Sequence, residues 1–279
     1  MDTLAILLTI FAVLIFILLV YFVFLKIFKT KKVDSDSVKI SNKGINNNTK
    51  EKTKKPKSSY SKLNLIEKTK GDLDKFEENL YKKDSSVGLI LGARGSGKSA
   101  LGMRIAENFV SKTEKNICTI GFNKGEIPSY IKIIEDVEQI PNNSFVLIDE
   151  GGIFFSSRDF MNNANKLVSK LILIARHKDL SILFITQNSS NIDVNIIRQS
   201  DYLMLKPSSL LQLDFERAKV KIIYEEIKNG FEKYKSENGL FYIYSTDFTG
   251  FVTNGLSSFW NTKISKSMGK KNISKKQDL

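Results

Sequence analysis

The sequence predicts an α/β domain with a mainly parallel sheet, preceded by a helix that spans a membrane. Five short apolar runs of strand length lie between residues 87 and 205, and helical periodicity follows the first of them. A glycine-rich segment, "GARGSGKS", stands directly after that first strand. The third observation is an N-terminal run, residues 4–25, that carries no charge.

The N-terminal run, "LAILLTIFAVLIFILLVYFVFL", is long enough to cross a bilayer. As a helix it would extend about 33 Å, against about 30 Å for a hydrocarbon core. A cleaved signal peptide is the alternative, but the run is too long, no basic region precedes it and no small-residue cleavage site follows it. Asp2 precedes the run and lysines follow it from Lys26 onward. We therefore expect the N-terminus outside and the body of the chain in the cytoplasm.

The chain is basic, with a formal charge of +13 from 43 Lys and Arg against 30 Asp and Glu. Such a surplus favours polyanions, either nucleic acid or anionic lipid headgroups. Much of it lies in the polar stretch after the membrane run and in the C-terminal tail, so a solvated, disordered linker is the alternative explanation. Cys118 and His177 are the only residues of their types, which excludes an intrachain disulfide and speaks against a zinc site.

The glycine-rich segment Gly92–Ser99 fits the pattern G-x-x-x-x-G-K-[ST] between the strand at 87–91 and a helix. Glycines let backbone N–H groups close around phosphates, and the helix N-terminus adds partial positive charge. Lys98 is expected to reach the β and γ phosphates of ATP and Ser99 to hold Mg²⁺, whereas Arg94 occupies a variable position. The residues expected to bind the nucleotide are Gly92, Ala93, Arg94, Gly95, Ser96, Gly97, Lys98, Ser99 and Ala100.

An acidic pair, Asp149 and Glu150, ends the apolar run in "SFVLIDEGGIFF". A carboxylate at the tip of such a strand can reach Mg²⁺, so Asp149 joins Ser99 as an expected metal residue. An adjacent glutamate can polarise the attacking water, which makes Glu150 the expected general base. The alternative is that two carboxylates merely end a strand at the surface.

The run at 181–186 ends in Thr186 and Gln187, an uncharged amide at the tip of a core strand. Taken together, "GARGSGKS", "VLIDEGGIFFSSRDF" and "ARHKDLSILFITQNSSNIDVNIIRQSDYLMLKP" resemble the FtsK–HerA superfamily of P-loop ATPases. Their order is most similar to the zonula occludens toxin-like proteins of filamentous phages and their relatives in archaeal viruses. The resemblance covers about residues 86–207, and here the membrane helix comes first, whereas in toxin-like proteins it usually follows the ATPase.

The resemblance implies the additional-strand, catalytic-glutamate type of P-loop fold. Numbered along the chain, the strands are 87–91, 117–122, 144–149, 181–186 and 201–205. Their implied order in the sheet is 5-1-4-3-2, with flanking helices. The fourth strand then ends beside the γ-phosphate, where Gln187 would hydrogen-bond the attacking water or sense the loss of the phosphate. A glutamine that only caps a loop is the alternative.

The resemblance also implies a homo-oligomeric ring, with a hexamer favoured and ATP between neighbouring subunits. An arginine supplied by the next subunit would stabilise the transition state. Arg198 is the preferred candidate, Arg176 the second and Arg158 a third, although each could be an ordinary surface arginine.

Outside the region of resemblance, three further elements are expected. Leu63, Ile66, Leu73, Phe76 and Leu80 lie near helical spacing and predict a helix interrupted at Gly71. A long charged helix is expected over 208–235, with an apolar stripe of Leu213, Val220, Ile223 and Ile227. The segment "GLFYIYSTDFTGFVTNG" predicts a hairpin turning near 246–250, whose aromatic residues either pack a core or stack on bases.

The predicted organisation is a membrane anchor at 1–29, a polar basic linker at 30–60, a P-loop ATPase domain at 61–262 and a basic tail at 263–279. The expected function is a membrane-anchored ATP hydrolase, using ATP and Mg²⁺, that drives DNA translocation, packaging, or virion assembly or export. Its membrane would be that of the host or the virion, and its partners DNA and coat or secretion proteins. The alternative is a membrane-tethered ATP-binding scaffold that recruits partner or coat proteins with little turnover.

Overall fold

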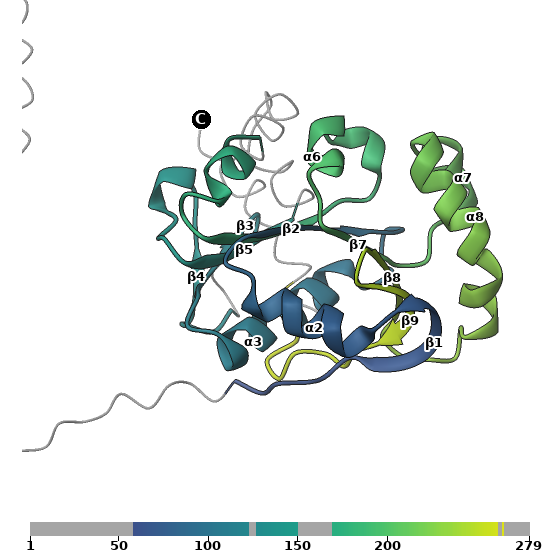
Figure 1. Ribbon diagram of the computed structural model, residues 1–279, viewed down its shortest axis with the longest axis horizontal. Coiled ribbons are helices and arrows are strands. Elements are labelled where there is room, and N and C mark those ends of the chain that lie inside the picture. The colour runs from purple at the N-terminus through teal and green to yellow at the C-terminus, as the bar shows by residue number, and fades with distance from the viewer. Residues whose placement is uncertain (1–57, 123–126, 150–168, 262–263, 265–279) are drawn as a thin grey trace, which may run out of the picture. The chain divides into compact units, whose positions relative to one another are not determined.

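The computed structural model describes residues 58–122, 127–149, 169–261 and 264 (Figure 1). Within these ranges one nine-stranded sheet has the order β1-β9-β8-β7-β2-β6-β5-β3-β4. The strands are β1 (Asn64–Gly71), β2 (Ser86–Leu91), β3 (Asn116–Ile120), β4 (Ile131–Ile133), β5 (Ser144–Asp149), β6 (Leu180–Ile185), β7 (Tyr202–Leu205), β8 (Leu240–Ser245) and β9 (Phe248–Thr253). The helices are α2 (Leu73–Lys82), α3 (Lys98–Lys112), α6 (Val194–Arg198), α7 (Leu210–Asp214) and α8 (Ala218–Lys233), with 3₁₀ turns η1 (Val137–Gln139) and η2 (Ser189–Asn191).

The middle of the sheet is parallel and contains the five strands predicted from the apolar runs. They lie side by side as β7-β2-β6-β5-β3, which is 5-1-4-3-2 in the numbering of those five strands. β2, β5 and β6 are buried along their whole length, as expected for parallel strands covered on both faces. The sheet is larger than predicted, because β4 extends one edge and β8, β9 and β1 extend the other.

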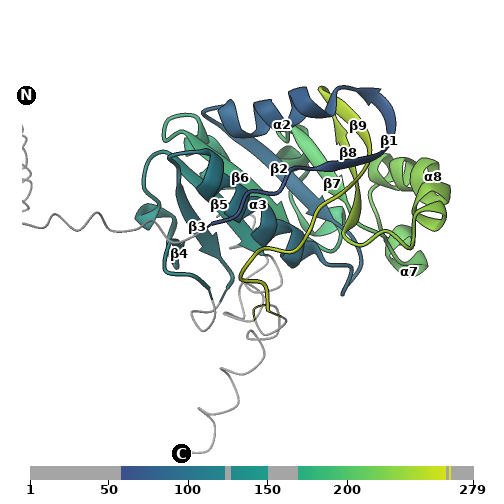
Figure 2. The same cartoon turned by 90° about the horizontal axis from the view of Figure 1, so that it is seen from below.

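Helices lie on both faces of this sheet (Figures 1 and 2). The buried apolar side chains form two layers, one on each face. Successive side chains of a strand point to opposite faces. Leu89 of β2 therefore joins the layer that contains α6 and α8 residues. Its neighbour Ile90 joins the other layer, together with the apolar side of α2 and α3. Helix α3, which begins at the glycine-rich loop, is thereby packed against the centre of the sheet.

The edge strand β1 corrects the helix predicted between residues 63 and 80. Residues up to Gly71 form β1, which pairs antiparallel with β9 from Asn64 opposite Thr253 to Gly71 opposite Phe248. Only the second half of the segment is helical, as α2. The backbone turns at Gly71, which has φ of 81°, and Asp72 then caps α2 by accepting a hydrogen bond from the N–H of Lys75. The apolar spacing in 63–71 was compatible with both structures, and pairing with a distant strand decided between them.

The predicted hairpin near the C-terminus is confirmed as β8 and β9, which pair antiparallel. Four of its aromatic residues are buried and pack in the two apolar layers: Phe241, Tyr242, Phe248 and Phe251. This agrees with core packing rather than with stacking on bases. Tyr244, by contrast, is exposed.

The single long helix predicted over 208–235 is wrong in one respect, because it is broken into α7 and α8. The chain leaves helical geometry at Arg217, whose φ and ψ of −61° and 138° are extended. In α8 the predicted stripe of Val220, Ile223 and Ile227 is buried, as expected for an amphipathic helix.

Among the described helices, none has both the length and the apolar character needed to cross a bilayer. The predicted anchor at 4–25, nearly all of the predicted linker and the predicted basic tail lie outside the described residues. The described residues all belong to one unit of the chain, Lys54–Leu279.

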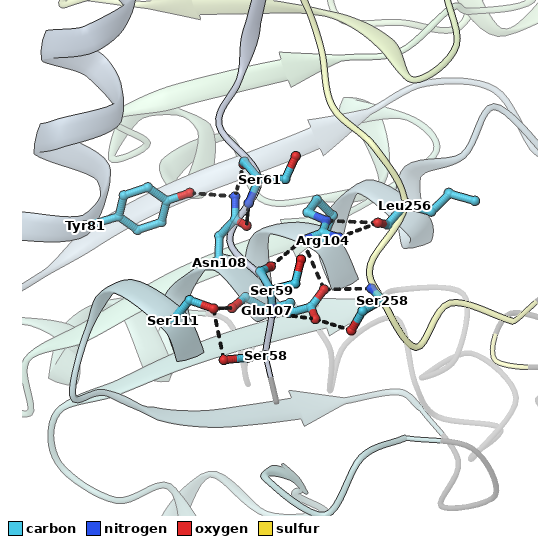
Figure 3. Close-up of polar contacts among 10 residues, drawn as sticks. All are labelled: Ser58, Ser59, Ser61, Tyr81, Arg104, Glu107, Asn108, Ser111, Leu256 and Ser258. Carbon is cyan, nitrogen blue, oxygen red and sulfur yellow. Dashed lines mark hydrogen bonds and ion pairs between the residues drawn. The ribbon is translucent and has the colours of Figure 1, made fainter. Parts of the chain in front are cut away.

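A buried polar cluster on α3 holds both ends of the described chain (Figure 3). Arg104 and Glu107 form an ion pair of 3.1 Å with almost no exposed surface. The Glu107 carboxylate accepts hydrogen bonds from the N–H groups of Ser59 at 3.1 Å and Ser258 at 2.8 Å. The Arg104 guanidinium donates to the carbonyl oxygens of Ser59 at 2.6 Å and Leu256 at 3.1 Å. One helix thus fixes the N-terminal segment and the segment that follows β9.

We predict that Glu107→Ala lowers the free energy of unfolding by about 3–5 kcal/mol, because it leaves the Arg104 guanidinium buried without its carboxylate. Urea unfolding followed by circular dichroism would measure the change. Glu78→Ala is the matched control, since Glu78 forms an exposed i,i+4 pair with Lys82 and its loss should have a much smaller effect. Equal effects of the two substitutions would contradict the prediction.

Candidate nucleotide-binding site

The glycine-rich segment forms a loop between β2 and α3 at the carboxyl edge of the parallel strands. Gly97 has φ of 90° and precedes the first residue of α3 without any side-chain cap. Such a left-handed conformation favours glycine, and it leaves the first N–H groups of α3 for a ligand. The hydroxyl oxygen of Ser96 is buried in this loop with no hydrogen-bond partner among the described residues. An anion seated on the loop would satisfy both kinds of donor.

Lys98, the first residue of α3, folds its side chain back onto the loop. Its ammonium donates to the carbonyl oxygens of Gly92 and Ala93, each at 2.8 Å. The side chain is buried although it carries a charge. These contacts hold a positive charge against the loop, which is where the phosphates of a nucleotide would lie.

Ser99 and Asp149 meet directly, although 50 residues separate them in the chain. The Ser99 hydroxyl donates to Oδ2 of Asp149 at 2.7 Å. A hydroxyl and a carboxylate oxygen are ligand types that Mg²⁺ accepts beside phosphate and water oxygens. This donor set fits Mg²⁺ in company with a nucleotide. The described part of the chain holds no cluster of three or more His, Cys, Asp or Glu residues that would bind a metal alone.

Gln187 lies at the same edge as the glycine-rich loop. The N–H of Thr186 donates to the carbonyl oxygen of Ile90 at 3.0 Å, so β6 keeps its pairing with β2 up to that point. In the same register, Asp149 of β5 stands opposite Ile185 of β6. The exposed Gln187 therefore follows at the edge where Asp149 ends β5 and the loop leaves β2. Glu150 lies outside the described residues.

The loop after Gln187 is held by two residues that the sequence analysis did not single out. The buried Glu216 carboxylate accepts a hydrogen bond from the N–H of Ser189 at 3.0 Å and another from its hydroxyl. The Arg217 guanidinium donates to the carbonyl oxygens of Ser189 at 2.9 Å and Ile192 at 2.6 Å. Both belong to the break between α7 and α8. In the sequence they resemble any charged pair on a helix surface, so no local signal distinguishes them.

The two described arginine candidates lie away from the loop. Arg176 precedes β6 and Arg198 precedes β7, so both stand at the amino ends of strands whose carboxyl ends carry the site. A six-residue strand separates these edges by about 20 Å. Arg198 lines a cavity of about 790 Å³ at that far edge, together with Asp201. Within one chain neither arginine approaches the loop, and their action on a neighbouring subunit stays a prediction. Arg158 lies outside the described residues.

Comparison with known families agrees with these motifs. The family described as Zonular occludens toxin (Zot) matches residues 101–202, from α3 to the first residue of β7. This is the resemblance that the motifs predict. The Zot match spans the acidic strand and the strand that ends before Gln187, but it covers less than half of the chain. A comparison with curated protein sequences gives no match.

Several solved structures are similar over larger parts of the chain. The genome packaging NTPase B204 from Sulfolobus turreted icosahedral virus 2, in complex with ATP-gammaS, is 13% identical, with 62% of this chain and 98% of that chain covered and a TM-score of 0.41. EssC (ATPases 2 and 3) from Geobacillus thermodenitrificans is 10% identical, with coverages of 76% and 49% and a TM-score of 0.40. The N-terminal domain of zonular occludens toxin from Neisseria meningitidis is 12% identical, with coverages of 65% and 97% and a TM-score of 0.34. Because these TM-scores lie below 0.5, the likenesses carry no weight for the function of this chain.

We predict that Glu216→Ala lowers the free energy of unfolding by about 1–3 kcal/mol, because the N–H of Ser189 loses its buried acceptor. It should also lower kcat for ATP more than it changes KM, since the loop after Gln187 is no longer held. Urea unfolding and steady-state kinetics would measure the two effects. The exposed Glu225 of α8 supplies the control substitution, Glu225→Ala, which should leave both quantities unchanged. A Glu216→Ala protein with unaltered kcat would contradict the positioning role.

Proposed function

We propose that this chain is an ATP hydrolase of the P-loop class and the motor subunit of a membrane-anchored DNA-translocating or virion-assembly machine. The observation that carries the proposal is the convergence of Lys98, Ser99 and Asp149 at the glycine-rich loop, with the Ser99–Asp149 contact of 2.7 Å. The Zot match over 101–202 supports the same class.

Each residue of the site has a distinct task in ATP hydrolysis. The loop N–H groups and Lys98 neutralise the β and γ phosphates. Ser99 and Asp149 would hold Mg²⁺, which neutralises the charge that develops on the leaving oxygen. Glu150 accepts a proton from the attacking water, and Gln187 orients that water. Because little covalent chemistry is required of the protein, positioning and charge account for most of the catalysis.

Two properties support the motor role: the net charge of the chain and an exposed apolar patch beside the nucleotide site. The net charge of +13 favours a polyanionic partner such as DNA. The short helix α7 and the residue after it expose three apolar side chains, with exposed fractions of 74% for Leu210, 69% for Leu211 and 69% for Phe215. α7 begins three residues after Pro207, whose carbonyl oxygen accepts a hydrogen bond from Ala93 of the loop. An apolar patch this close to the nucleotide site supports contact with a second copy of the chain in a ring, with the membrane anchor supplied by residues 4–25.

We predict that Lys98→Ala or Asp149→Asn lowers kcat for ATP by about 100-fold or more, because each change removes charge stabilisation at the reacting phosphates. Phosphate release by the full-length chain in detergent micelles, with and without Mg²⁺, would measure the effect. The control is Lys132→Ala, since Lys132 is an exposed lysine on the edge strand β4 and should retain full activity. No Mg²⁺-dependent turnover by the unaltered chain, with or without DNA, would contradict the proposal.

A motor and a scaffold respond differently to DNA. Turnover that rises strongly when double-stranded DNA is added supports the motor. Tight ATP binding with slow turnover that is indifferent to DNA supports the scaffold that recruits a partner or coat protein.

We predict that Leu210→Asp combined with Phe215→Asp shifts the full-length chain toward smaller assemblies, because each charge would be buried in the proposed subunit contact. Analytical ultracentrifugation in the presence of ATP would measure the distribution of sizes. The control is Leu173→Asp, since Leu173 is exposed and lies in the helical residues 169–175, which precede the amino end of β6. An unchanged distribution in the double variant would exclude α7 from the contact.

A further inference from the structure

Lys206 lies directly beside the glycine-rich loop, and it is the next-to-last residue of the run "DYLMLKP", without any role predicted from the sequence. It follows the last residue of β7, and its N–H donates to the carbonyl oxygen of Leu91 at 2.7 Å. The next residue, Pro207, accepts a hydrogen bond from the N–H of Ala93 at 2.9 Å. The pairing between β7 and β2 is thus continued into the first residues of the loop.

The side chain of Lys206 packs against the glycine-rich loop at Gly92 and extends toward Gly97. A methyl group added to Gly92 would meet Cβ of Lys206 at 2.6 Å, so only glycine leaves room for the lysine stem. Its ammonium would lie 4.0 Å from a Cβ built on Gly97, the residue that precedes Lys98. Lys206 therefore approaches the loop from the β8 side, and its Nζ donates to the carbonyl oxygen of Leu240 at 2.9 Å.

Burial of the Lys206 ammonium is unfavourable in free energy. The residue is 5% exposed, and burial lowers the pKa of Lys206 to about 8. Within the described ranges no carboxylate forms an ion pair with it, and its other neighbour is the ring of Phe241, whose centre is 5.5 Å away. The titratable group in contact with this residue from an adjoining element is Tyr224 of α8, whose hydroxyl donates to the Lys206 backbone carbonyl oxygen at 3.1 Å, while Lys98 of α3 donates to Ala93 within the same loop. A buried cation without an anion costs free energy that a bound phosphate group would offset.

We propose that Lys206 is a positioning residue for the nucleotide. Its ammonium, which lies behind the backbone of Gly97, supplies a second positive charge to the β-phosphate. This inference rests on the proposed ATP site. Lys98 would act from one side of the loop and Lys206 from behind it. Because an anion bound at the loop raises the pKa of this lysine, nucleotide binding should be coupled to proton uptake above about pH 8. The affinity for ADP should accordingly fall as the pH rises from 7.5 to 9.5.

The test uses the full-length chain in detergent micelles and Mg²⁺-ADP as the probe, with affinity measured by isothermal titration calorimetry. Lys206→Met retains most of the apolar stem and removes the charge. We expect it to weaken ADP binding about 10-fold at pH 7.5 and to abolish the loss of affinity at higher pH, while Lys206→Arg retains most of the affinity. The matched control is Lys219→Met on the exposed side of α8, which should behave as the unaltered chain. A Lys206→Met protein that melts at a lower temperature but binds ADP with unchanged affinity and unchanged pH dependence would overturn the inference.

A second measurement needs no variant. Calorimetry of the unaltered chain at pH 8.5 in two buffers of different ionisation enthalpy reports the protons taken up on ADP binding, and no uptake would also overturn the inference. Failure of the ATP site itself has a different signature, in which the unaltered chain binds no ADP and Lys98→Ala changes nothing. If Lys98→Ala abolishes ADP binding while Lys206→Met is indistinguishable from the unaltered chain, only the role of Lys206 is excluded.

Discussion

Parallel pairing between β2 and its two neighbours is the constraint on which the candidate site depends. In a parallel sheet every strand presents its carboxyl end at the same edge, so residues that are distant in the chain meet there. β2 pairs with β6 on one side and with β7 on the other, and β5 pairs with β6 in continuous register. A one-residue slip would turn Asp149 away from Ser99 and reverse the buried faces of the strand. The burial of both faces is what makes such a slip costly, so the hydrophobic layers hold the polar site in place.

Helix α3 links this site to the rest of the molecule. Its first turn carries Lys98 and Ser99, and its second and third turns carry the buried Arg104–Glu107 pair that holds the segments around Ser59 and Ser258. The segment at Ser59 is the point where the predicted linker from the membrane run reaches the described domain. A load applied at Ser59 would therefore act on the same helix that is proposed to bind the phosphates.

A second set of contacts connects the loop after Gln187 with α7 and α8. The buried contacts of Glu216 and Arg217 join the loop after Gln187 to the break between α7 and α8. The adjacent helix α7 exposes apolar side chains to its surroundings. A change at the γ-phosphate, which Gln187 is proposed to sense, would thus reach the surface where a neighbouring subunit is proposed to bind. The two connections together join the proposed nucleotide site to the segment at Ser59 and to the exposed apolar surface of α7.

The sequence by itself determined the glycine-rich loop, the five core strands, helix α3 and the candidates Lys98, Ser99, Asp149 and Gln187. These features are local, because an apolar run or a short motif predicts its structure from a few neighbouring residues. The strand β1, the break between α7 and α8, and the places of Lys206 and Glu216 were decided only by the tertiary structure. Each depends on a partner far away in the chain, such as β9 for β1 or Leu240 for Lys206, and the free energy of such contacts is not encoded in local spacing. A charged residue that is buried beside a site looks the same in the sequence as one that is solvated on a surface, which is why the lysine behind the loop could be found only once the strands had been assembled.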